Sequence, residues 1–106
     1  MDMNDMILVS VDDHLCEPPH MFDEHLADRW RDEAPKLLHT DNGSDVWTFN
    51  GAIIPNVGLN AVAGRPKEEY GIEPTSFEEI RSGCYDIDER IKDMDAGGVL
   101  GSMCFP

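Results

Sequence analysis

Two side chains near the start of the chain, Asp12 and His14, have the types and the spacing of a metal-ligand pair. They follow Ile7–Val11, an apolar and β-branched run interrupted by one serine, which is typical of a strand buried on both faces. Residues two apart in a strand point the same way, so Asp12 and His14 can aim at one point while Asp13 faces elsewhere. One carboxylate oxygen and one imidazole nitrogen suit a divalent Zn, Mn or Fe ion.

The same triplet is also typical of an ordinary loop start, in which aspartates accept hydrogen bonds from turn backbone. We expect that role for Asp13. Glu17 follows shortly, before Pro18 and Pro19, which bar a helix at that point. The Glu17 carboxylate can orient a metal ligand or bind substrate, or it can accept hydrogen bonds from the Pro18-Pro19 turn, and the sequence leaves both roles open.

Two longer patterns resemble a known family. The string V-D-D-H-x-x-E-P-P, from Val11 to Pro19, resembles the first strand of amidohydrolase family 2. This is the branch of the amidohydrolase superfamily that contains the aminocarboxymuconate semialdehyde decarboxylase-like metal-dependent hydrolases and decarboxylases. The pattern D-x-D-E-R-x-x-x-M-D-x-x-G-V, from Asp86 to Val99, leads into a run that ends in Phe-Pro. It looks like the segment that joins the first two barrel strands in the same branch.

The resemblance implies an α/β fold, the N-terminal part of a (β/α)8 barrel. Residues 1–106 would supply strand one, a β-meander and loop inserted at about 34–75, a helix and strand two. It implies that Asp12 and His14 hold a divalent metal, zinc first and Mn or Fe as alternatives, with Glu17 orienting a ligand or contacting substrate. The general base and the other ligands would lie outside this chain. The reaction implied is hydrolysis by activated water, or nonoxidative decarboxylation of a small carboxylated substrate.

A barrel of this kind takes at least about 200 residues, and this chain has 106. Two parallel strands with one crossover helix leave backbone groups unpaired and a sheet face bare, so we expect the chain not to be self-sufficient. Its partner would be the remaining barrel polypeptide, either a second chain or a cleaved C-terminal part, in an oligomer. The alternative is a small acidic non-enzymatic binding or regulatory module, which the size and the net charge of −14 favour.

The composition bounds the partners and the compartment. Acidic residues number 22 against 8 basic ones, which argues against nucleic acid or an anionic membrane as a partner. Met1–Asp5 is acidic where a secretory signal would be basic, so we expect a cytoplasmic protein. Three cysteines without C-x-x-C spacing indicate reduced thiols. Cys16, beside the expected site, is interpreted as a small buried apolar residue rather than a nucleophile, since no dedicated base is evident.

The remaining patterns predict the elements that position the site. Trp47 and Phe49 share one face of the predicted meander, and we expect them to pack on a larger body, with an aromatic binding platform as the alternative. Ile87, Ile91 and Met94 form one stripe of the last helix, with its charged residues mostly outward. The expected elements are a short helix within Pro19–Trp30, strands at Lys36–Thr40, Asp45–Asn50 and Ala52–Ile54, an irregular connection over 58–75, a short helix from Ser76 to about Gly83, a helix over Asp86–Ala96 and a strand over Val99–Phe105.

Overall fold

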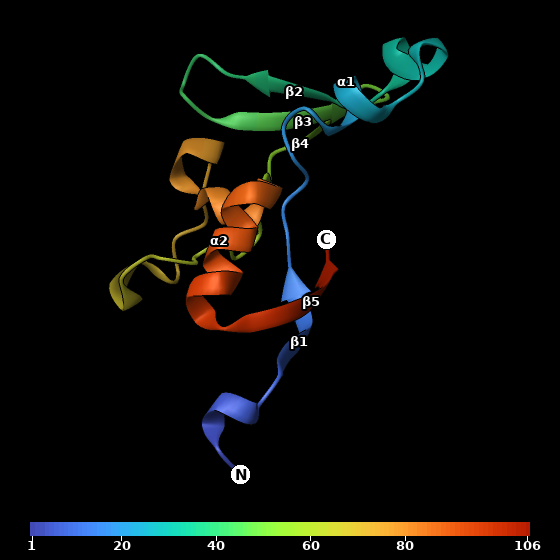
Figure 1. The fold of residues 1–106 in the computed structure, drawn as a ribbon. Helices are drawn as coiled ribbons and strands as arrows, with labels where there is room; N and C mark the ends of the chain where they lie inside the picture. The colour runs from blue at the N-terminus through green and yellow to red at the C-terminus, as the bar shows by residue number, and fades with distance from the viewer.

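The first and last strands of the chain lie side by side. In the computed structural model, which describes residues 1–106, β1 (Leu8–His14) and β5 (Val99–Phe105) pair in parallel, with Leu8 opposite Val99 and His14 opposite Phe105. Figure 1 shows the two strands crossing the lower part of the molecule, with α2 (Ile87–Gly97) beside β5. The predicted strand, crossover helix and second parallel strand are confirmed, and the chain is mixed α/β.

The ends of α2 follow from local sequence. The Asp86 side chain accepts a hydrogen bond from the Glu89 amide at 3.0 Å, which satisfies one of the free donors of the first turn. Gly98 ends the helix in the left-handed conformation, with φ of 67°, a backbone angle that favours glycine. Both ends therefore lie within one residue of the sequence prediction.

The predicted β-meander is a three-stranded antiparallel sheet in the order β2-β3-β4. Its strands are β2 (Lys36–His39), β3 (Asp45–Phe49) and β4 (Ala52–Ile54). Asn-Gly pairs mark both turns, and the positive φ angles of Gly43 (86°), Asn50 (50°) and Gly51 (78°) explain why. Figure 1 shows this sheet at the top of the molecule, next to the short helix α1 (Met21–His25).

The hydrophobic core lies beneath this meander. Trp47 is 8% exposed and packs edge-on against Phe22 of α1, with the ring centroids 5.6 Å apart. Phe49 is 42% exposed, so the expectation that both aromatic rings pack inward is met by Trp47 alone. The five buried residues of the core are Cys16, Trp47, Val57, Phe77 and Ile80.

One predicted helix is wrong. Between Ser76 and Gly83 the chain forms two 3-10 turns, Phe77–Glu79 and Ser82–Cys84, separated by Ile80 in an extended conformation. Ile80 is 5% exposed, so the chain breaks there to place this side chain in the core. The Ser76 side chain makes no capping hydrogen bond, and Glu79 instead accepts one from the Thr75 amide at 2.6 Å.

The apolar residues of β1 and β5 are not buried within this chain. Leu8, Val11 and Leu100 are 54%, 67% and 72% exposed, so the burial predicted for β1 on both faces is not met within this chain, for which a bare sheet face was also expected. Two strands and one helix are too few layers to cover a sheet on both sides. The α2 stripe behaves in the same way, since Ile87 and Ile91 are also exposed. None of the helices is long and apolar enough to cross a membrane.

Candidate functional site

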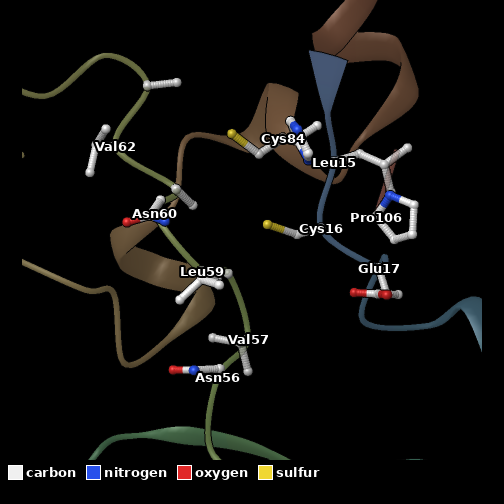
Figure 2. A pocket seen from close by; sticks show the side chains of 14 residues that line it. Leu15, Cys16, Glu17, Asn56, Val57, Leu59, Asn60, Val62, Cys84 and Pro106 are labelled. Carbon is white, nitrogen blue, oxygen red and sulfur yellow. The ribbon is translucent and has the colours of Figure 1, made fainter. Parts of the chain in front are cut away.

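The carboxyl ends of β1 and β5 open onto a cavity. It has a volume of about 590 Å³ and is lined by residues 14–17 at the end of β1, residues 56–63 after the meander, Cys84 and Pro106. Figure 2 shows Cys16, Glu17 and Cys84 on one wall and the chain from Asn56 to Val62 on the other. Parallel strands place their functional side chains at this end, so the cavity is the candidate functional site of the chain.

Asp12 and His14 converge as their spacing predicts. The His14 Nε2 atom lies 3.5 Å from the Asp12 Oδ1 atom, and the two side chains are 70% and 82% exposed. Donors bound to one tetrahedral zinc ion at about 2.0–2.1 Å lie roughly 3.3–3.4 Å apart, so this pair fits two positions of such a site. No group of three or more His, Cys, Asp or Glu side chains within the chain is placed to hold a metal.

Asp13 hydrogen-bonds to neighbouring strand residues and to helix α2. Its carboxylate accepts hydrogen bonds from Ser10 Oγ at 2.7 Å, from Ser102 Oγ on β5, and from Arg90 Nη2 on α2 at 3.3 Å. The two serine hydroxyls, Ser102 first, and then the Arg90 guanidinium lower the pKa of Asp13. The expectation that Asp13 caps turn backbone is wrong, because its partners are side chains on three different segments.

Arg90 is the functional-site neighbour that sequence reasoning missed. Its Nη1 donates to the carbonyl oxygens of His14 and Gly83, both at 3.4 Å, so one guanidinium connects α2 to the end of β1. Gly83 lies against α2 so closely that a Cβ atom there would meet the Asp93 carboxylate. The sequence does single out Arg90 as a candidate for an ion pair, since it is one of two basic residues in a helix whose other charged residues are acidic.

Cys16 is a buried thiol at the base of the cavity. It is 7% exposed, and burial, together with the neighbouring Cys84 and Glu17, raises its pKa to about 11. A thiol with so high a pKa is protonated at neutral pH and is a poor nucleophile. The geometry therefore agrees with the interpretation of Cys16 as a small apolar packing residue. All three cysteines are free thiols.

Glu17 lies between two cavities. It lines the 590 Å³ cavity and also a smaller one of about 260 Å³ beneath the meander. Within the chain its carboxylate has no ion-pair partner. The turn at Pro18 is closed by a backbone hydrogen bond from the Met21 amide to the Pro18 carbonyl at 3.0 Å. A role for Glu17 in orienting a ligand or contacting substrate remains a prediction.

Comparison with known proteins gives no match, either to a protein-family model or to a curated sequence. The resemblance to amidohydrolase family 2 therefore stays a prediction from the two sequence patterns.

Proposed function

We propose that this chain is the N-terminal part of a metal-dependent amidohydrolase-like enzyme. It would supply the first two strands of a (β/α)8 barrel that a further polypeptide completes, and the assembled enzyme would hydrolyse or decarboxylate a small carboxylated substrate. The observation that carries the proposal is the pair Asp12 and His14, 3.5 Å apart at the carboxyl end of a strand with a parallel neighbour. Barrel enzymes place their active sites at this end of their strands.

The exposed apolar surface of the strands supports the same proposal. Side chains of β1, β5 and α2 that would normally be covered stand 48% to 72% exposed, among them Val11, Ile91 and Leu100. Apolar side chains exposed together in this way are typical of a surface that another protein segment covers. Further strands and helices of a barrel would cover both faces of the β1-β5 pair.

The residues of the chain divide into two groups by their contacts. Asp12 and His14 would hold the divalent metal, zinc first and Mn or Fe as alternatives, with further ligands from the rest of the barrel. When bound, such a metal supplies Lewis-acid chemistry or an activated water. Asp13 and Arg90 hold the end of β1 in place. The Arg90 guanidinium donates a hydrogen bond to the His14 carbonyl oxygen at 3.4 Å, and the Asp13 carboxylate accepts one from the Ser102 hydroxyl. Glu17 extends from the next turn into the cavity.

The composition of the native material tests whether the barrel is completed. We expect intact mass spectrometry and size-exclusion chromatography to show a second polypeptide that travels with this one, because the β1-β5 pair lacks a cover. A well-folded monomer of 11.9 kDa would contradict the barrel and would favour the small acidic binding module.

Metal analysis of the assembled protein tests the ligand pair. We expect Asp12→Ala and His14→Ala each to lower bound zinc by about 10-fold or more, because each removes a donor from a site with few ligands. His25→Ala is the matched control, since that imidazole is 77% exposed on α1 and should leave the metal content unchanged. Unchanged metal in the two site variants would remove both residues from the ligand set.

A further inference from the structure

The smaller cavity, beneath the meander, has aromatic walls. It is a groove of about 260 Å³ whose lining comes from α1, β3, β4 and the chain segments beside them: Glu17, Phe22, Pro35, Trp47, Phe49, Ile54 and Asn56. Phe22 and Trp47 meet edge to face, and Phe49 is left 42% exposed at the groove. Three aromatic rings therefore converge on one small space.

The only charged side chain in the groove lining is negative. Glu17 is the single ionisable residue of the lining, and no cation of the chain pairs with it. The nearest basic residue along the lining segments is Lys36, next to Pro35, and its ammonium lies 3.5 Å from the Asp23 carboxylate. The groove thus places a carboxylate without an ion-pair partner beside three aromatic side chains.

This combination of groups selects for a particular ligand chemistry. Aromatic faces attract cations, and the attraction strengthens as water is excluded. A primary ammonium or a guanidinium keeps its N–H donors hydrogen-bonded in water, and any donor that faces the Phe22, Trp47 and Phe49 rings would lose its water partner without gaining an oxygen acceptor. A neutral apolar ligand would displace water from the Glu17 carboxylate without supplying a positive charge to pair with it. A methylated ammonium has no such donors to satisfy and keeps the positive charge.

We propose that this groove binds a small molecule that carries a quaternary ammonium group, with the methyl groups against Phe22, Trp47 and Phe49 and the charge facing Glu17. This goes beyond the proposed metal-dependent function and does not depend on it, because neither Asp12 nor His14 lines the groove. Glu17 and Asn56 line both cavities, so a molecule bound here lies beside the mouth of β1 and β5.

Ligand-detected saturation-transfer NMR on the native protein, with any polypeptide that accompanies it, tests the proposal. The probes are choline and its neutral carbon isostere, 3,3-dimethyl-1-butanol, which have the same shape and differ in charge. We expect choline to bind roughly 10-fold more tightly than the isostere, in line with the strength of a partly desolvated cation–π contact. Glu17→Gln and Phe49→Ala should each remove most of this difference.

The matched control is Glu68→Gln, which removes one carboxylate in the loop turn Lys67–Glu69, away from the groove lining. Its choline affinity should equal that of the parent protein. Circular dichroism of each variant reports whether the fold is kept. Equal affinity for the two probes, no binding of either probe, or an equal loss in Glu68→Gln and Glu17→Gln would each overturn the proposal.

Discussion

The molecule has two halves that are held together in different ways. The meander half consists of β2, β3 and β4 with the core that packs on them, and the strand half consists of β1, α2 and β5. Around β2, β3 and β4 the chain buries its own core, and every residue of that core lies outside β1, α2 and β5. In the strand half no residue of those three elements is buried, and Leu100 is 72% exposed. One half therefore has an internal apolar core, whereas the other presents apolar surface.

Polar contacts hold the strand half in place instead. The Asp13 carboxylate joins Ser102 on β5 and Arg90 on α2, and the Asp93 carboxylate of α2 binds Arg81 through two hydrogen bonds of 2.6 and 2.8 Å. Such directional bonds fix the positions of a helix and two strands without covering them. The strand half can therefore keep its geometry while its apolar faces remain available to a covering partner.

The largest effect should come from the core of the meander half. Trp47→Ala should lower the free energy of unfolding by about 3–5 kcal/mol, because it removes a buried ring from a packed core. Urea denaturation followed by circular dichroism measures this loss. Trp30→Ala is the matched control, since Trp30 is 47% exposed and its loss should cost much less. Equal losses in the two variants would show that the meander half has no core of its own.

A smaller and local effect should follow from the polar contacts of the strand half. Arg90→Met keeps much of the side-chain length and removes the donors to Asp13 and to the His14 carbonyl. We expect amide protons of β1 and β5 to exchange faster while those of β3 keep their protection, as measured by hydrogen exchange. Arg29→Met is the control, because Arg29 only stacks on the exposed Trp30 ring. Loss of protection at β3 would show that the halves unfold as one unit.

Lowering the pH should destabilise the strand half before the meander half. The pKa of Asp13 is lowered chiefly by the Ser102 hydroxyl, and the pKa of Asp93 by hydrogen bonds from Arg81. Because both pKa values are lowered in the folded state, this stabilisation is full above the ordinary value of about 4 and is lost as the pH falls through the folded values. Thermal melting from pH 6 to pH 2.5, monitored by amide NMR, should show the strand half loosening first. In Asp93→Asn this acid dependence should be weaker.

The smallest effect on the meander core should come from a change in the exposed strands. In the native assembly, Leu100→Ser should change the free energy of unfolding of the meander core by no more than about 0.5 kcal/mol, because Leu100 does not contribute to that core. In the native assembly the same change should weaken the association with the completing polypeptide, measured by analytical ultracentrifugation. An unchanged association in the Leu100→Ser assembly would mean that the exposed side chain of β5 contacts no partner, and the contrast between the halves would fail.

Local chemistry along the sequence determined much of the fold. Asp86 and Gly98 mark the ends of α2 because a capping carboxylate and a left-handed glycine act within a few residues. Asn-Gly pairs fix both turns of the meander by their positive φ angles, and the two-residue strand period brings Asp12 and His14 together. Each of these features depends on neighbours in the chain.

Contacts between distant segments were decided only by the tertiary structure. Asp13 meets Arg90 and Ser102 across 77 and 89 residues, and no local pattern states which carboxylate will find which partner. The aromatic groove likewise forms only when α1 packs on the meander. Ile80 breaks a predicted helix because burying it in a core assembled from remote residues outweighs a weak helical preference. Packing selects among conformations that the local sequence leaves nearly equal in free energy.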